Sequence, residues 1–188
     1  QEMLFGSPPN VDDSGKVNIL IHDILDNFEN SGTFIAGYFD PLDQEIQGEC
    51  YLNCMDIIHI DCNPLNLKNN FPEQALYTLA HEYNHLLHFN VDQCEGLGTI
   101  PGCSDEYNFN PWLNEGFADL APYLLGLGER DYIPYFQNTY IGLDHWYEDP
   151  SLASSFYGKS AIFLKYLFEH YGLEIIQSIF SDSRKQGL

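Results

Sequence analysis

Residues 70–89 read NFPEQALYTLAHEYNHLLHF and carry the clearest structural signal in the chain. Its apolar residues recur at steps of three and four, the spacing that places side chains on one face of an α-helix. Asn70 is suited to cap such a helix, Pro72 fits its first turn, and Glu73 can complete a capping box. The sequence therefore predicts a long helix that begins near residue 70 and is deeply buried.

Two histidines in the middle of this helix, in the run His81-Glu82-Tyr83-Asn84-His85, are four residues apart. They lie about 40° apart around the helix axis, so their imidazoles can converge on one metal ion. Glu82 projects beside that face, where its carboxylate can take the proton of a metal-bound water. Polar side chains in a mostly apolar helix are costly unless they are paired or coordinated. The run is the H-E-x-x-H pattern of zinc peptidases, and it predicts His81 and His85 as ligands and Glu82 as general base.

A third protein ligand is needed to complete a catalytic metal site whose fourth position is left to water. The third ligand cannot be the last histidine of an H-E-x-x-H-x-x-G-x-x-H pattern, because His88 stands at the glycine position and Val91 at the last histidine position. A glutamate from a following helix is the other option, and the segment 112–119 (WLNEGFAD) supplies it. Glu115 and Asp119 are four residues apart and share a helix face. We expect Glu115 to bind the metal and Asp119 to accept the free ring N–H of a ligating histidine.

Together the two motifs resemble the gluzincin metallopeptidases, the thermolysin-like group with two histidines and one glutamate on zinc. A closer resemblance is to the hyicolysin-type neutral metallopeptidases of bacteria, and it spans most of the chain. Flanking segments that share in it are Gly37-Tyr38-Phe39, Ile57-Ile58-His59-Ile60-Asp61, Thr78-Leu79-Ala80, Tyr157-Gly158-Lys159-Ser160 and residues 166–172. The resemblance implies one catalytic zinc ion on His81, His85 and Glu115, Glu82 as general base, and Asp119 orienting His81. It also implies secretion or a cell-surface location of the kind that bacterial export produces.

The tetrahedral oxyanion formed in peptide hydrolysis needs a hydrogen-bond donor besides the metal. In related gluzincins a tyrosine or histidine of the C-terminal lobe supplies it. Tyr157, at the start of a Tyr-Gly-Lys-Ser run, is our first choice, and His145, beside Trp146, is the reserve. The sequence leaves this choice open.

The order of the local signals predicts an α+β fold, with strands first and helices later. Strands are expected over 17–21, 33–39 and 56–61, with a helix around 22–29 between the first two. The resemblance implies an N-terminal mixed β-sheet lobe, a central active-site helix and a mostly helical C-terminal lobe, which is a zincin-like arrangement. We expect one metallopeptidase catalytic domain over 1–188, divided into 1–90 and 91–188.

Two more helices are predicted beyond the active-site helix. One starts at Asn110-Pro111, and Pro122 should kink or end it, because proline cannot donate to the preceding turn. The other runs over about 157–171, with Ser154 or Ser155 as a cap and Gly172 as a stop. The segment 129–150 between them is aromatic-rich and expected to be irregular.

Charge restricts the partners of the chain. The 188 residues include 7 Lys+Arg and 28 Asp+Glu, a formal net charge of −21. Long-range repulsion makes nucleic acid and anionic membranes poor partners, and no apolar run reaches the length of a membrane span. Protein or peptide substrates and a monomeric state are expected. Acidic loops could bind Ca²⁺, but no twelve-residue calcium-loop pattern indicates it.

The remaining cysteines and histidines give weaker signals. Cys94 with Cys103, and Cys50 or Cys54 with Cys62, could close disulfides, or all five could be buried thiols. His59 alternates with Ile58 and Ile60, so it should face away from them, and His22 and His170 are expected at the surface. The chain begins without Met, which suggests a processed or trimmed N-terminus, and its ending is typical of a point in a longer protein.

The sequence predicts a zinc endopeptidase and leaves two alternatives. One is an aminopeptidase of the same fold, for which the expected G-x-M-E-N signature is absent. The other is a binding or adhesion domain that keeps the metal for structure alone. The presence of Glu82 favours an enzyme, because a purely structural metal site has no use for a base.

Overall fold

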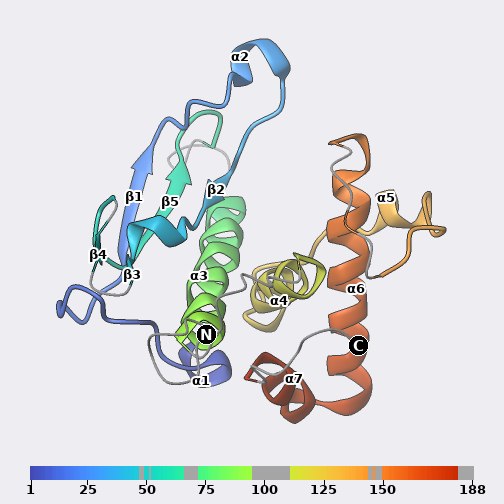
Figure 1. Cartoon of the computed structure of the whole chain (residues 1–188). Coiled ribbons are helices and arrows are strands. Elements are labelled where there is room, and N and C mark those ends of the chain that lie inside the picture. The colour runs from blue at the N-terminus through green and yellow to red at the C-terminus, as the bar shows by residue number, and fades with distance from the viewer. Residues whose placement is uncertain are drawn as a thin grey trace.

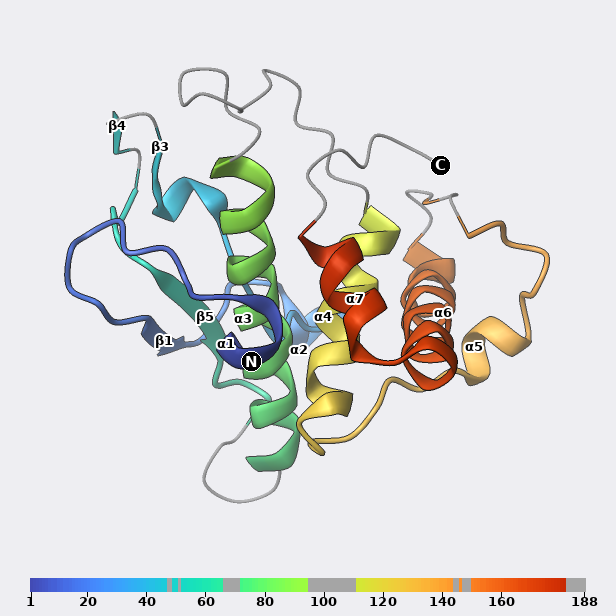
Figure 2. The ribbon, with the colours of Figure 1, turned by 90° about the horizontal axis from the view of Figure 1, so that it is seen from below.

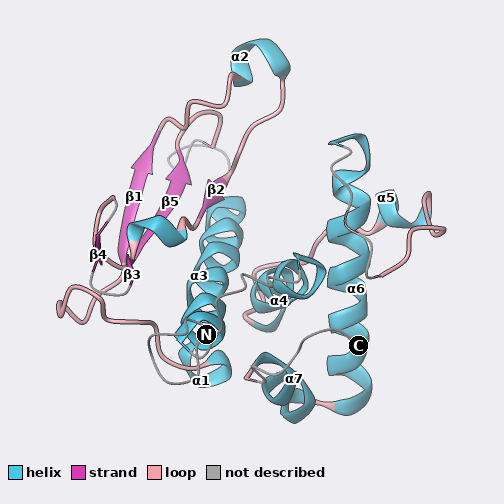
Figure 3. Ribbon diagram, viewed as in Figure 1, coloured by secondary structure: helices cyan, strands magenta, loops and turns pink. Residues whose placement is uncertain are grey.

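The computed structural model describes residues 1–46, 49–50, 52–65, 72–94, 111–143, 146 and 150–181. The helices in this part of the chain are α1 (Glu2–Phe5), α2 (Phe28–Ser31), α3 (Pro72–Cys94), α4 (Pro111–Leu124), α5 (Ile133–Phe136), α6 (Ala153–Tyr171) and α7 (Leu173–Phe180). The strands are β1 (Asn18–His22), β2 (Gly37–Tyr38), β3 (Glu45–Ile46), β4 (Glu49–Cys50) and β5 (Ile57–Asp61), and two 3₁₀ turns are η1 (Pro41–Asp43) and η2 (Pro150–Leu152). The strands precede the long helices along the chain, which is compatible with the predicted α+β class. Figure 3 shows the strands gathered on one side of the structure.

A three-stranded mixed sheet forms the N-terminal half of the structure. Its order is β1-β5-β2, with β1 parallel and β2 antiparallel to the central strand β5. Residues of β5 point alternately to the two faces of the sheet. Ile58 and Ile60 pack against Leu86 of α3, so α3 covers one face of the sheet (Figure 1).

α3 links the sheet to the helical half of the structure. Leu86 contacts the sheet, whereas the next residue, Leu87, belongs to the core formed with α4, α6 and α7. That second core gathers Phe5, Phe117 and Phe180, among other residues, and it brings the first helix against the last (Figure 2). The helix is therefore buried on both sides, as its apolar pattern predicts, and its central polar residues face the space between the two halves.

The structure corrects two predictions for the first sixty residues. The expected strand 33–39 is reduced to β2, and the backbone N–H of Ile35 donates to the side chain of Asp26 at 2.6 Å and not to a neighbouring strand. The expected helix around 22–29 is only α2, since His22 continues β1 as the partner of Asp61. Asn27 then adopts a left-handed conformation with φ 63°, so no continuous helix runs from residue 22 into α2.

The predicted helix ends are partly confirmed. Pro122 does not end α4, which continues for two more residues to Leu124. α6 begins four residues before Tyr157, without the predicted side-chain cap, because Ser155 is buried and donates to the carbonyl of Pro134. Gly172, at φ 81°, ends α6 as predicted, and α7 follows directly. The cap Asn70 lies outside the described residues.

The cysteine prediction is corrected at one position. Cys62 is a free, exposed thiol, so neither Cys50 nor Cys54 pairs with it. Cys54 does take part in a disulfide. Cys103 lies outside the described residues. Among the residues that are described, we find no helix with the length and apolar character needed to cross a membrane.

Gly37 lets β2 lie close to both β5 and α3. A Cβ at this position would lie 2.7 Å from the carbonyl oxygen of His59 and 2.8 Å from Cγ2 of Thr78. We expect Gly37→Ala to lower the free energy of unfolding by about 1–3 kcal/mol, the usual cost of overpacking. Chemical denaturation would measure it. Gly158→Ala is the matched control, because its Cβ would come no closer than 3.3 Å to a neighbour and alanine favours the helix; a larger loss there than at Gly37 would contradict the prediction.

Candidate metal centre and catalytic cleft

Three side chains from α3 and α4 converge on one point. His81 and His85 are one helical turn apart, and their Nε2 atoms lie 3.1 Å from each other. Oε2 of Glu115, on α4, lies 3.2 Å from Nε2 of His81 and 3.4 Å from Nε2 of His85. One ligand atom of each residue lies within 4.8 Å of the other two. The cluster is compatible with binding a metal ion.

The chemistry of these donors fits a metal such as zinc. Two imidazole nitrogens and one carboxylate oxygen form the ligand set of several catalytic zinc sites. Oε2 of Glu115 is buried and has no hydrogen-bond partner among the described residues. Burial alone would raise the pKa of Glu115, but the neighbouring His85 and His81 hold it well below its usual value. A buried carboxylate kept ionised between two imidazoles is a suitable position for a cation.

Asp119 orients the ring of His81 through Nδ1, the ring nitrogen on the side away from Glu115. Its Oδ1 lies 2.8 Å from Nδ1 of His81, which leaves Nε2 of that ring facing Glu115. Tyr77 donates its hydroxyl to the same oxygen at 2.8 Å, and Arg130 donates to both oxygens at 2.7 and 2.8 Å. Burial opposes ionisation of Asp119, yet His81 and Arg130 keep its pKa below the usual value. The carboxylate is therefore ionised and oriented.

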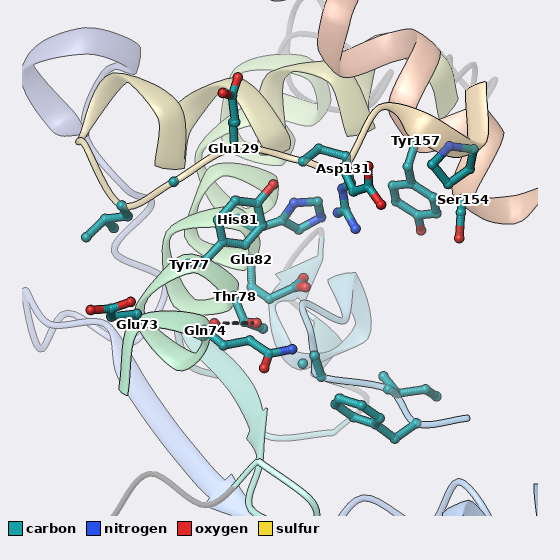
Figure 4. Close-up of a pocket in the computed structure, with 18 residues that line it drawn as sticks. Glu73, Gln74, Tyr77, Thr78, His81, Glu82, Glu129, Asp131, Ser154 and Tyr157 are labelled. Atoms are coloured by element: carbon teal, nitrogen blue, oxygen red, sulfur yellow. Dashed lines mark hydrogen bonds between the residues drawn. The ribbon is translucent and has the colours of Figure 1, made fainter. Parts of the chain in front are cut away.

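Glu82 lies beside the ligand cluster and faces the cleft between the two halves (Figure 4). Its side chain is buried, and burial raises its pKa, although the nearby His81 and His85 and the backbone N–H of Phe39 oppose the rise. A raised pKa brings a carboxyl group closer to the range in which it can both accept and return a proton near neutral pH.

Tyr157 of α6 reaches the cluster from the opposite side. Its hydroxyl lies 3.4 Å from Oε1 of Glu115, and its ring centroid lies 6.5 Å from that of His81. Burial, followed by the charge of Glu115, raises the pKa of this hydroxyl, so it keeps its proton. The guanidinium of Arg130 lies 4.9 Å from the centroid of the Tyr157 ring, within cation–π range.

The cleft has a volume of about 670 Å³, and its lining forms a floor and two walls. Its floor is the side of α3 from Glu73 to Glu82, one wall is the segment 34–37 that leads into β2, and the other comprises 127–131 with Tyr157 (Figure 4). A groove between the segment that leads into β2 and the loop 127–131, with Glu82 on its floor, has room for an extended chain.

Other residues singled out in the sequence lie elsewhere. His88 does not line the cleft; its Nδ1 lies 2.9 Å from Oδ1 of Asn114, and its ring packs against Phe117 and Phe180. His145 lies outside the described residues, so the structure does not compare it with Tyr157.

Sequence reasoning missed Arg130 and Tyr77. Tyr77 stands four residues before His81, so helical spacing alone could have placed it on the same face. The signal for Arg130 was weaker. Basic residues are rare in this chain, which has only 7 Lys+Arg against 28 Asp+Glu, so each of them was a candidate partner for a buried carboxylate.

The metal-free protein should lose stability as the pH rises above neutral. Burial lowers the pKa of His81, but Asp119 and Glu115 outweigh it and raise the pKa to about 10. Its stabilising contribution is then complete below the unfolded pKa of about 6.5 and is lost as the pH rises through the folded value. Thermal unfolding of chelator-treated protein between pH 6 and 10 would measure a falling midpoint. Asp119→Asn should flatten the fall, and an equally steep fall in that variant would contradict the assignment.

Comparison with known proteins agrees with this geometry. No protein-family model matches the chain. The chain is similar to the neutral metalloprotease ShpI of Staphylococcus hyicus, with 34% identity over 172 residues, covering 87% of this chain. The match supports a metallopeptidase family. The chain spans 37% of the length of that relative.

Proposed function

We propose that this chain is the catalytic part of a zinc-dependent endopeptidase with a zincin-like fold of the gluzincin type. The observation that carries the proposal is the convergence of His81, His85 and Glu115 beside Glu82 at the floor of the cleft. Similarity to a neutral metalloprotease supports the same class of reaction. A carboxylate beside the ligands distinguishes this arrangement from a site that holds a metal for structure alone.

In the proposed mechanism, His81, His85 and Glu115 would hold one zinc ion, which would supply Lewis-acid activation of the scissile carbonyl and of the attacking water. Glu82 accepts the proton of that water and passes it to the leaving amine. Asp119 keeps the Nδ1 proton of His81 in place, so that Nε2 remains the ligand atom. Tyr157 donates its hydroxyl hydrogen bond to the carbonyl oxygen as negative charge develops there.

Protein or peptide segments are the proposed substrates, bound in extended form along the cleft. Phe34, Ile35 and Gly37 form the wall that faces such a segment on the sheet side. Secretion or display at the cell surface is part of the proposal, as is a monomeric state.

The test is hydrolysis of peptides blocked at both ends, together with an unfolded protein substrate. An endopeptidase cleaves both, a chelator abolishes the cleavage, and one equivalent of zinc restores it. An aminopeptidase leaves the blocked peptides intact and cleaves those with a free amine. Zinc-loaded, folded protein that cleaves none of these substrates would refute the enzymatic proposal in favour of a metal-stabilised binding domain.

A further inference from the structure

A second pair of facing imidazoles lies on the side of the sheet opposite α3. Nδ1 of His59, on β5, lies 3.3 Å from Nε2 of His22, on β1. The two rings are nearly perpendicular, at 76°, with centroids 5.4 Å apart. His59 is buried and His22 is half-buried, so one nitrogen of the pair is held inside the protein and the other lies near its surface.

Asp43 determines which nitrogen of His59 carries the proton. Its Oδ2 lies 2.8 Å from Nε2 of His59, and an ionised carboxylate can only accept. Asn53 donates to the other carboxylate oxygen at 2.5 Å, and Tyr38 stacks on the His59 ring with centroids 4.2 Å apart. A neutral His59 that donates its Nε2–H to Asp43 presents the lone pair of Nδ1 to His22.

We propose that His22 and His59 form a binding site for a divalent transition-metal ion, separate from the centre on α3. The ligand atoms are Nε2 of His22 and Nδ1 of His59. Two nitrogens bound at about 2.0–2.1 Å to one tetrahedral ion are about 3.4 Å apart, close to the distance found here. Imidazole ligands suit zinc, copper and nickel.

The pair repeats the local geometry of the centre on α3. There the two Nε2 atoms lie 3.1 Å apart, and a carboxylate, Asp119, lies behind one ring. Here the spacing is 3.3 Å, and Asp43 lies behind His59. A carboxylate on the far nitrogen raises the basicity of a ligating imidazole and fixes its direction. Among the described residues no third ligand atom converges with these two, so water would complete the coordination.

The proposed ion would join β1 to β5, the edge strand to the centre of the sheet. Because it would bind the folded chain in preference to the unfolded one, it should stabilise the protein. This stabilisation does not depend on peptide hydrolysis, so the second metal site can be tested separately from the proposed function.

The test is a titration of zinc-loaded full chain with Ni²⁺, followed by calorimetry, metal analysis and thermal unfolding. We expect one Ni²⁺ per chain in addition to the retained zinc, and a higher unfolding midpoint. His22→Ala should weaken Ni²⁺ binding at least tenfold and leave the zinc content unchanged. Asp43→Asn should weaken it by about 10–100-fold, the usual effect of removing the group behind a ligating histidine.

Three further variants separate a metal site from its alternatives. His22→Gln can still donate a hydrogen bond to Nδ1 of His59 but lacks the imidazole. This variant should therefore lose Ni²⁺ binding if the pair is a metal site, and it provides the test even if His22→Ala folds poorly. His170→Ala removes an exposed histidine of α6 and should leave binding unchanged, and Cys62→Ser tests the free thiol in the same way. Absence of a second ion, full binding in His22→Gln, or loss of binding in Cys62→Ser would overturn the proposal and leave a His–His hydrogen bond.

Discussion

Replacing Glu82 by glutamine should lower kcat/KM for peptide hydrolysis by about 10²–10⁴-fold, the usual contribution of a positioned general base. The amide has nearly the same shape as the carboxylate but cannot take a proton from water. Because Glu82 is outside the convergent ligand set, the variant should keep one metal ion per chain. Steady-state kinetics on a blocked peptide, with metal analysis of the same sample, measures both quantities.

Glu73→Gln is the matched control for this variant. Glu73 lies at the start of the same helix and lines the same cleft, but it is exposed and remote from the ligand cluster. It should retain activity within a few-fold of the parent. Equal activity of Glu82→Gln and the parent would show that another group accepts the proton, and loss of metal from Glu82→Gln would show a role in the ion site instead.

Local patterns in the sequence were sufficient for α3 and for its contribution to the site. The spacing of His81 and His85 is set by the helix, so the convergence of their rings follows once the helix is known. The sequence offered Glu115 as the third ligand because a glutamate is a suitable residue type. Its position in space could not be predicted, because 29 residues separate it from His85 and no local rule places α4 against α3. The structure brings Glu115 to both rings.

Features that depend on distant contacts could not be read from local patterns. Arg130 reaches Asp119 from the chain beyond α4, and nothing around residue 130 indicates that contact. Of the strand expected over 33–39 only β2 forms, and the backbone N–H of Ile35 donates instead to Asp26, a side chain nine residues earlier. His59 was expected to face away from Ile58 and Ile60, and it does, but its burial beneath Asp43 and Tyr38 was not predictable from alternation.

The described contacts make α4 the element on which the candidate site depends most. Glu115 and Asp119 both project from it toward α3, one to the convergent point and one to the back of His81. Gly116, between them, allows α4 to pack closely on α6, since a Cβ there would lie 3.1 Å from the carbonyl oxygen of Ser160. The same packing brings Tyr157 of α6 to Glu115. The helix that supplies the third ligand therefore also fixes where the tyrosine hydroxyl lies.

Replacing Tyr157 by phenylalanine should lower kcat by about 10²–10³-fold, the usual effect of removing one donor to a developing oxyanion. The hydroxyl lies 3.4 Å from Oε1 of Glu115, too long to contribute much to holding that carboxylate, so metal content and folding should be unchanged. Because the hydrogen bond to substrate strengthens only as charge develops, KM should change much less than kcat. Kinetics on a blocked peptide separates the two constants.

Tyr166→Phe controls for loss of a hydroxyl from the same helix. Tyr166 is 46% exposed and packs against His170, away from the cleft, so this variant should match the parent. If Tyr157→Phe raised KM and left kcat unchanged, Tyr157 would be a substrate-binding residue and not an oxyanion donor. If both constants were unchanged, the donor would have to be another group, and His145→Gln would be the next variant to measure. A loss of metal in Tyr157→Phe would instead mean that its weak contact with Glu115 helps to hold the ligand in place.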